Sequence, residues 1–252
     1  MSNMKKLKAV ALIPARLGSK RLPKKNIKVL EGHPLIAYTI CPAINSGVFD
    51  RVIVSTESEE IKDIALAYGA EVPFMRPLEY AADSSEDIDF VLHALDELKK
   101  AGYEPDCFSI LRPTNPMRQP ETIQRAWKTF VEHGEKAHSL RAVEKCAQHP
   151  AKMWKISGNR MRPVMENPHS SETPWHSMSY QALPEIHVQN ASLEIAWSRV
   201  ALEEGTIAGT EIIPFVSEGY EGFDINLPED WYLCEYLIHN ELVKLPKITK
   251  RK

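Results

Sequence analysis

Short apolar runs alternate along most of this chain with segments whose apolar residues recur at helical spacing. Short runs of this kind, bounded by polar turns, are typical of buried strands. The runs that predict core strands are Ala9–Ile13, Arg51–Ser55, Cys107–Leu111, Ala137–Val143 and Thr210–Val216.

Helical periodicity fills the segments between and after these strands. The predicted helices are Pro34–Ser46, Glu57–Tyr68, Asp87–Lys100, Glu121–Glu132 and Glu229–Asn240. Several of them begin with proline, serine or an acidic residue, which suits a helix N-terminus. Alternation of strand and helix predicts an α/β fold with a doubly wound, mostly parallel sheet. Ligands of such sheets bind beyond the carboxyl ends of the strands, so the polar loops at those ends are the candidates for a site.

The alternation stops between residues 144 and 182, a segment rich in His, Met, Trp, Pro and Ser. A structureless loop of this length is uncommon inside a compact domain. Exposed Trp and Met side chains are usually covered by another surface. We therefore expect one domain over residues 1–252, in which residues 144–182 form an inserted subdomain, lid or dimerisation arm.

Composition narrows the class of protein. The chain has 252 residues and a formal net charge of −3, so the molecule as a whole is not a nucleic-acid binder and its basic residues matter only where they cluster. No apolar run approaches the roughly 18 residues that a membrane span needs. The four cysteines show no CxxC pair, which is typical of reduced thiols in a cytoplasmic protein.

The loop that follows the first strand is the strongest candidate for a binding site. The segment 13–26, IPARLGSKRLPKKN, is called the basic loop below. Its cations surround a Gly18-Ser19 turn and are Arg16, Lys20, Arg21, Lys24 and Lys25. A turn of small residues lets backbone N–H groups approach an anion, which the cations then neutralise. The loop matches neither GxxxxGK[ST] nor GxGxxG, yet it predicts a polyphosphate ligand, with a nucleoside triphosphate favoured.

A second polar segment, LRPTNPMR, follows the third strand. Arg112, Thr114 and Arg118 offer donors at the same predicted edge of the sheet, and arginine suits bidentate recognition of phosphate or carboxylate. The alternative is a rigid connection that carries surface arginines.

The segment GFDINLPEDW supplies a carboxylate. Asp224 is predicted to end a short strand facing the basic loop, where a Mg²⁺ ligand would bridge phosphate oxygens. Glu229 and Asp230 are explained by the start of the following helix. A turn-capping role for Asp224 stays open as the alternative.

A fourth segment, LPEIHVQNASLEIAW, contains an alternating strand. His187, Gln189 and Asn190 precede or occupy it and are candidates to line a substrate pocket, although a structural histidine is about as common. The other histidines show no metal-ligand spacing.

Together with PLIAYTI, RVIVSTESEEI, MRPLEYAAD and HPAKMW, these segments resemble the acylneuraminate cytidylyltransferase family, and they occur in its order over nearly the whole chain. That family makes CMP-activated sialic acids and related nine-carbon keto sugars. The resemblance implies a Rossmann-like α/β domain and a homodimer, with residues 144–182 as the dimerisation subdomain. It also implies that an acidic sugar acceptor attacks the α-phosphorus of CTP with its hydroxyl and expels pyrophosphate.

The resemblance also implies roles for residues. The catalytic residues would be Arg16, Lys25 and Asp224. The nucleotide would be held by Arg16, Gly18, Ser19, Lys20, Lys25, Asn26, Arg76 and Asp83. From the polar segments and the resemblance taken together, the acceptor would be held by Arg112, Thr114, Arg118, Lys152, Gln181, His187, Gln189 and Asn190. The cofactor would be Mg²⁺, held by Asp224 and Asn226. Such a displacement needs charge neutralisation and in-line positioning more than covalent chemistry.

The chain departs from the family pattern mainly on the acceptor side. The usual DID metal motif reads Asp224-Ile225-Asn226, which loses one negative charge and should bind Mg²⁺ more weakly. Arg112 stands where Gln is usual, and Tyr180 and Val188 stand where sialic-acid enzymes place arginines. Asn190-Ala191 stands where the sialic-acid members of the family have the dipeptide Asn-Gly. We therefore expect a nonulosonic acid other than N-acetylneuraminate, with Arg112 as a candidate partner of its acid group.

Two other functions stay open at this point. One is the same chemistry on 3-deoxy-manno-octulosonate, an eight-carbon acid. The other is a nucleotide-binding paralogue without turnover, which Asn226 favours and the retained lysines and Asp224 oppose.

Overall fold

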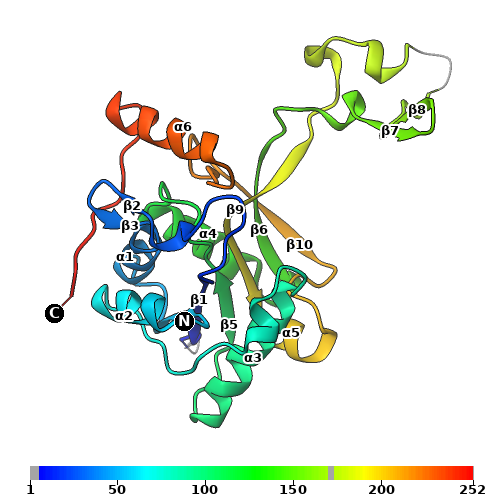
Figure 1. Ribbon diagram of the computed structural model, residues 1–252. Helices are drawn as coiled ribbons and strands as arrows, with labels where there is room; N and C mark the ends of the chain where they lie inside the picture. Colours follow the sequence, from blue (N-terminus) through cyan, green and yellow to red (C-terminus); the bar gives the residue numbers. More distant parts are fainter. Residues whose placement is uncertain (1–5, 170–172, 252) are drawn as a thin grey trace. The chain divides into compact units, whose positions relative to one another are not determined.

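The computed structural model describes residues 6–169 and 173–251 (Figure 1). The chain forms two compact units, a larger one of Met1–Ala142 with Asn190–Lys252 and a smaller one of Val143–Gln189. The smaller unit contains the segment 144–182 that the sequence sets apart, of which residues 170–172 lie outside the described residues. Among the described helices, none is long and apolar enough to span a bilayer.

A six-stranded sheet with the order β10-β6-β9-β5-β1-β4 organises the fold. The strands are β1 (Ala9–Pro14), β4 (Arg51–Ser55), β5 (Cys107–Ile110), β6 (Ser139–Lys145), β9 (His187–Trp197) and β10 (Ile212–Val216). β1 pairs in parallel with both β4 and β5, whereas β9 pairs antiparallel with β5. The predicted Rossmann-like α/β fold is confirmed, and the sheet is mixed beyond β5.

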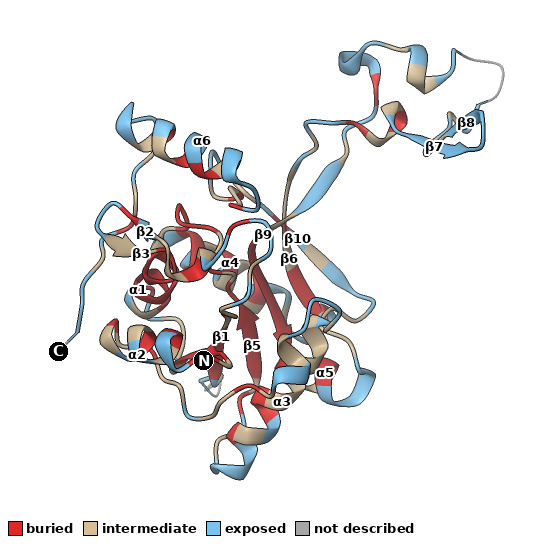
Figure 2. Cartoon of the chain, in the orientation of Figure 1, coloured by how far each residue is buried: buried red, intermediate tan, exposed pale blue. Residues whose placement is uncertain are grey.

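Helices cover both faces of this sheet (Figure 2). They are α1 (Ala37–Asn45), α2 (Glu59–Ala67), α3 (Asp87–Lys100), α4 (Pro120–His133), α5 (Ser198–Glu204) and α6 (Pro228–His239). Residues of α1, α2 and α4 pack in one core cluster, residues of α3 pack in another on the opposite face, and α5 contributes to both. The sequence does not predict α5, because two turns are too short to display a helical period.

A third, smaller core joins α6 to the basic loop. Trp231 and Leu237 of α6 pack with Leu22, Tyr38 and Ile225. The hairpin of β2 (Val29–Leu30) and β3 (His33–Pro34) borders this core, since Tyr38 Oη donates to the carbonyl of Leu30 at 2.8 Å. This packing brings the basic loop and the segment 222–231 together, although they are far apart in the sequence.

The order of the strands fixes where a ligand can bind. From β1 the chain crosses to β4 on one side of β1 and then to β5 on the other. The loops after β1 and β5 therefore diverge at the carboxyl edge of the sheet. A crevice at such a switch point is the usual ligand site of an open α/β sheet.

The smaller unit is built around turns and one antiparallel hairpin, β7 (Trp154–Ser157) with β8 (Arg160–Pro163). His149 is buried, and its Nδ1 accepts from the N–H of Ala151 at 3.1 Å while Nε2 lies 2.9 Å from the carbonyl of Pro184. Nε2 therefore donates to this carbonyl, and both ring nitrogens of His149 serve to hold the fold of the smaller unit.

Candidate active site

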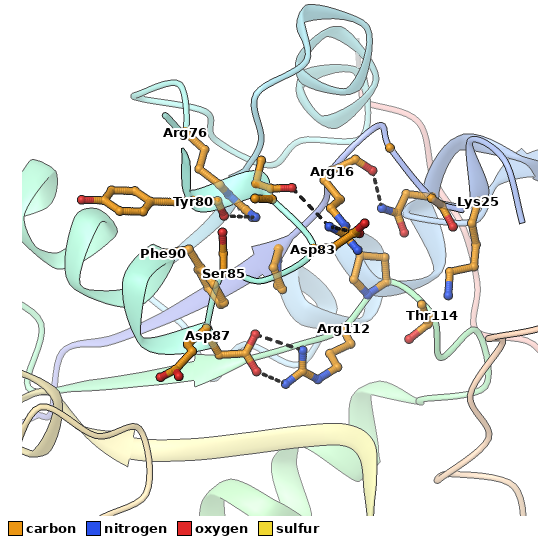
Figure 3. Close-up of a pocket in the computed structure, with 18 of the residues that line it drawn as sticks. Arg16, Lys25, Arg76, Tyr80, Asp83, Ser85, Asp87, Phe90, Arg112 and Thr114 are labelled. Carbon is orange, nitrogen blue, oxygen red and sulfur yellow. Dashed lines mark hydrogen bonds and ion pairs between the residues drawn. The ribbon is translucent and has the colours of Figure 1, made fainter. Parts of the chain in front are cut away.

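A cavity of about 300 Å³ lies at the switch point between β1 and β5 (Figure 3). It draws its lining from four separate parts of the larger unit. The lining residues are Pro14, Arg16, Gly18, Ser19, Lys25, Asn26, Arg76, Tyr80, Ala81, Ala82, Asp83, Ser85, Glu86, Asp87, Phe90, Arg112, Pro113, Thr114, Asp224 and Asn226. Most residues that the sequence predicts for the nucleotide and the metal are thus brought together.

Local backbone geometry shapes the basic loop. Lys24 adopts a left-handed conformation (φ 52°) just before the 3₁₀ turn Lys25–Ile27. Asn26 is buried and donates from Nδ2 to the carbonyl of Arg16 at 2.9 Å, which closes the loop on itself. Lys25 Nζ donates to the carbonyl of Ile225 at 2.5 Å and lies 3.4 Å from Asn226 Oδ1. Burial lowers the pKa of Lys25, which the nearby Asp224 carboxylate partly offsets.

Asp83 pairs with two cations of the basic loop. Its carboxylate lies 2.8 Å from Arg16 Nη1 and also contacts Lys20 Nζ. The hydrogen bond from Lys20, with the charges of both cations, lowers the pKa of Asp83. The side chain of Lys20 is largely exposed and does not line the cavity. A triphosphate that engages these two cations must therefore compete with the carboxylate of Asp83.

Arg76 is fixed at the other end of the cavity. Its Nε donates to Ser55 Oγ at 2.9 Å and Nη2 donates to the Ser55 carbonyl at 2.5 Å. The guanidinium lies 5.0 Å from the centroid of the Phe90 ring. Burial lowers the pKa of Arg76 to about 10, which still leaves it charged at neutral pH. This anchored cation beside an aromatic ring suits the nucleoside part of a nucleotide.

The predicted metal ligands lie beside Lys25. Asn226 Nδ2 donates to Asp224 Oδ2 at 2.5 Å, and Asp224 Oδ1 is buried without a hydrogen-bond partner among the described residues. An orphaned buried carboxylate oxygen fits a hard cation such as Mg²⁺. The amide nitrogen of Asn226 faces Asp224, and its amide oxygen lies near Lys25. Asp230 instead accepts from the backbone N–H groups of Asn226 and Leu227, as expected at the start of a helix.

The surroundings of Asp224 differ from the prediction in one respect, because Asp224 does not end a strand. Its segment is an irregular loop, held by the N–H of Ile225 donating to the Thr114 carbonyl at 2.9 Å and by Asn115 Nδ2 donating to the Glu221 carbonyl. Two isolated hydrogen bonds do not make a ladder, and they attach this loop to the one that follows β5.

Arg118 is not placed to bind an acceptor. It is fully buried, and its Nη2 donates to the Arg112 carbonyl at 2.9 Å while Nη1 donates to Thr39 Oγ1 at 3.3 Å. Burial lowers the pKa of Arg118 to about 9. Arg118 is absent from the cavity lining and supports the loop after β5 from within the core, so its prediction as an acceptor residue is corrected.

Arg112 does line the cavity, but its charge is already balanced. Its Nη2 contacts Asp87 and lies 3.2 Å from Glu194 Oε1. Glu194 in turn faces Arg141, with 3.1 Å between Oε2 and Nη2. Two guanidiniums and two carboxylates form a neutral chain of charges, which argues against Arg112 as the partner of an acceptor's acid group. The sequence analysis does not identify Asp87 or Glu194. Asp87 opens a helix, where an acidic residue is explained by the helix dipole, and Glu194 lies within strand β9, where the sequence does not show its partners.

The remaining predicted acceptor residues lie mostly in the smaller unit. Lys152 Nζ donates to the carbonyls of His176 and Met178, and Gln181 lines a hollow within that unit. His187 Nε2 lies 3.6 Å from Glu185 Oε1, and Gln189 also belongs to the smaller unit.

Asn190 belongs to the larger unit, where its Nδ2 donates to Ser217 Oγ at 2.9 Å. Because β9 runs antiparallel to β5 and Glu194 pairs with Ile110, Asn190 lies at the carboxyl edge of the sheet, the edge that carries the cavity.

Comparison with known proteins agrees with this geometry. Residues 10–194 match a family model described as cytidylyltransferase. A CMP-N,N'-diacetyllegionaminic acid synthase from Legionella pneumophila is 33% identical over 238 residues, covering 92% of this chain and 97% of that protein. A pseudaminic acid cytidylyltransferase from Campylobacter jejuni is 38% identical over 130 residues, covering 52% of this chain and 56% of that protein.

Among solved structures, a CMP:2-keto-3-deoxy-manno-octonic acid synthetase complexed with CTP has a TM-score of 0.67, covering 93% of this chain and 99% of that one at 17% identity. At this identity the likeness is one of fold. The family model spans most of the chain, and the Legionella protein aligns over almost the full length of both. This chain therefore belongs to the cytidylyltransferase family.

Proposed function

We propose that this protein transfers CMP from CTP to a hydroxyl of a nonulosonic acid and releases pyrophosphate. The observation that carries the proposal is the convergence of Arg16, Lys25 and Asp224 on one cavity at the switch point of the fold. The relatives from Legionella and Campylobacter are named for legionaminic and pseudaminic acid, which supports an acidic sugar of this class.

Direct displacement at the α-phosphorus suits the lining. The described lining residues include no cysteine or histidine that would act as a covalent nucleophile. Arg16 and Lys25 neutralise the charge that builds up on the phosphates as pyrophosphate leaves, and Gly18 and Ser19 let backbone N–H groups approach the phosphate oxygens. Catalysis then rests on orientation and charge, as in other phosphoryl-type transfers.

We also propose Mg²⁺ as the cofactor, with Asp224 and Asn226 as its protein ligands. When bound, the ion would supply positive charge to phosphate oxygens. Mg²⁺ is commonly held by one or two carboxylates together with substrate phosphates and water. The buried Oδ1 of Asp224, which has no hydrogen-bond partner in the described part of the chain, supports this assignment.

The amide at position 226 should make metal binding weak. Asn226→Asp is expected to lower the Mg²⁺ concentration for half-maximal activity several-fold, because a second carboxylate adds negative charge to the ligand set. Titration of pyrophosphate release with Mg²⁺ measures this effect. Asp224→Asn should raise the requirement instead. An unchanged requirement in both variants would contradict these residues as ligands.

The acceptor is identified by a panel of keto-deoxy acids. Pyrophosphate release from CTP is measured with legionaminic, pseudaminic, N-acetylneuraminic and 3-deoxy-manno-octulosonic acids. We expect release with a nonulosonic acid other than N-acetylneuraminate. Turnover with only the eight-carbon acid would replace the proposed acceptor. CTP binding without release for any acid would indicate a binding protein that has lost turnover.

We further propose that the smaller unit is the dimerisation arm of a homodimer. On the hairpin, Ile156 pairs with Met161 and Trp154 pairs with Pro163, so all these side chains lie on one face. Ile156 is 76% exposed and Met161 57% exposed. An isolated two-stranded hairpin with an uncovered apolar face is marginally stable alone, which supports a partner subunit as its cover.

The apolar face of the hairpin gives a direct test of this assembly. Ile156→Glu is expected to shift the protein from dimer to monomer, because a carboxylate would be buried at the interface. Sedimentation velocity measures the change. Lys155→Glu, on the opposite face of the same strand, is the matched control and should leave a dimer. A wild-type monomer at micromolar concentration would contradict the proposal.

We propose a cytoplasmic location because the cysteines are not paired in disulfides. All four cysteines are free, and Cys41, Cys107 and Cys234 are buried. Free thiols are typical of a reducing compartment.

A further inference from the structure

Asp224 lies between two points at which its loop is attached to the rest of the larger unit. After it, the N–H of Ile225 donates to the Thr114 carbonyl at 2.9 Å. Before it, the carbonyl of Glu221 accepts from Nδ2 of Asn115, which is fully buried. The segment between these points forms neither helix nor strand, so the attachments set the place of Asp224 in the cavity lining.

The side chain of Glu221 attaches the same loop to α4. Its Oε1 accepts from Thr122 Oγ1 at 2.6 Å and from Arg125 Nη1 at 3.2 Å. Its Oε2 accepts from Arg125 Nη2 at 2.6 Å and from the N–H of Glu218 at 2.8 Å. The side chain is 14% exposed. An ionised carboxylate has about four lone-pair sites, and all four are used here to hold the loop.

Local geometry explains why these groups meet. Thr122 and Arg125 are three residues apart in α4 and therefore lie on the same face of the helix. Glu218 opens a turn in which the N–H of Glu221 donates to the Glu218 carbonyl at 3.1 Å, and the left-handed backbone of Gly219 (φ 54°) permits this turn. One carboxylate thus joins α4 to the turn that precedes the proposed metal ligand.

The carboxylate of Asp224 depends on its backbone for its position. Its Oδ2 accepts from Asn226 Nδ2, and its buried Oδ1 has no hydrogen-bond partner among the described residues. The attachment at Ile225 is made by a backbone N–H, which no change of side chain removes. The attachment at Glu221 includes a bidentate pair with Arg125, the stronger kind of hydrogen bond because both partners are charged. This pair is the contact through which a side chain controls the loop.

We propose that Glu221, held by Thr122 and Arg125 of α4, is a positioning residue that fixes Asp224 for metal binding. Groups behind a metal ligand orient it, and their loss weakens metal binding although they do not touch the ion. This inference rests on the proposed function, since it takes Asp224 as a ligand of Mg²⁺. It gives α4 a part in the reaction, although α4 contributes no residue to the described cavity lining.

Hydrogen exchange of the full chain, without nucleotide or metal, tests the anchoring directly. Glu221→Gln keeps the size of the side chain but turns an NH₂ group towards donors. The amides of segment 222–226 should exchange about tenfold faster, as expected for the loss of a hydrogen bond to a charged group. Glu218→Gln is the matched control, because Glu218 belongs to the same turn and lies 3.5 Å from Arg125 but is 75% exposed. Its exchange should stay within about twofold of wild type.

Titration of pyrophosphate release with Mg²⁺ tests the consequence for the site. Glu221→Gln should raise the Mg²⁺ concentration for half-maximal activity about three- to tenfold, less than the loss of a group that hydrogen-bonds a metal ligand directly. KM for CTP at saturating Mg²⁺ should stay within about twofold, because the basic loop and Arg76 are unchanged. Glu218→Gln should match wild type in both quantities. A merely structural role would lower stability and leave the Mg²⁺ requirement as it is.

A second variant and a second assay keep the outcome clear. Thr122→Val removes one of the four hydrogen bonds and keeps the shape of the side chain, so it serves if Glu221→Gln does not fold, with a smaller effect in the same direction. CTP binding at limiting and saturating Mg²⁺ makes the comparison without an acceptor, so a failed acceptor panel leaves this test intact.

Two results would overturn the inference. One is wild-type exchange in both Glu221→Gln and Thr122→Val. The other is faster exchange with an unchanged Mg²⁺ requirement, since Glu221 would then hold the loop without positioning Asp224. A wild-type enzyme that needs no metal would contradict the proposed cofactor instead, and exchange would still decide whether Glu221 holds the loop.

Discussion

Lys25→Met is expected to reduce kcat/KM for CTP by about 10²- to 10³-fold, the usual loss when one preorganised electrostatic contact to a transition state is removed. Lys25 Nζ is held by the carbonyl of Ile225 and lies beside Asn226 and Asp224. The ammonium is therefore positioned before the substrate arrives, where the proposed metal and the phosphates would meet. Methionine keeps most of the apolar part of the side chain and removes the charge and its donors.

The neighbouring lysine provides the control. Lys24 is exposed and pairs with Glu60 at 2.9 Å, outside the cavity lining. Lys24→Met should therefore keep kcat/KM within about twofold of wild type, because exposed ion pairs contribute little. Steady-state kinetics with varied CTP measure both variants, with CTP binding as a second readout. Equal losses in the two variants would show that the basic loop acts by general charge and not through Lys25.

Local features of the chain were predictable from the sequence. The strand at Arg51–Ser55 and the helix at Asp87–Lys100 have the predicted bounds, because the strand is a short apolar run with polar ends and the helix has a clear period and a clear start. The basic loop was also readable, since its cations and small residues are consecutive and the preceding strand fixes its place at the sheet edge. A binding site whose residues are consecutive in the chain can therefore be predicted without a structure.

Features that depend on distant partners were not predictable. In the sequence Arg118 resembles a surface donor that would bind the acceptor. In the fold it is buried beneath the loop that follows β5. Arg112 resembles a free cation, but its partners lie 25 and 82 residues away in the chain. The antiparallel direction of β9 has the same origin, since the alternation within a strand shows which face is buried but not which neighbour it pairs with.

Glu194→Gln is expected to lower the free energy of unfolding by about 3–5 kcal/mol, the range for breaking a buried ion pair by removing one partner. Glu194 is buried between Arg112 and Arg141. Glutamine preserves the shape of the side chain, so the change isolates the charge. The change removes the charge that faces both Arg112 and Arg141, while Arg112 keeps its contact with Asp87. Urea denaturation followed by circular dichroism measures the loss. The wild type and the variant are fitted with the same dependence of the unfolding free energy on urea concentration.

Glu71→Gln is the matched control, because Glu71 pairs with Arg51 at a site where the Glu71 side chain is 45% exposed. Glu71→Gln should lower the free energy of unfolding by about 1 kcal/mol or less, since solvent screens an exposed ion pair. A similar cost for both variants would mean that the chain of charges behind Arg112 is as well hydrated as the surface. Arg112 would then lack the rigid support that a buried polar network gives. A large cost for Glu194→Gln alone, together with a higher KM for CTP, would instead tie the stability of this buried network to nucleotide recognition.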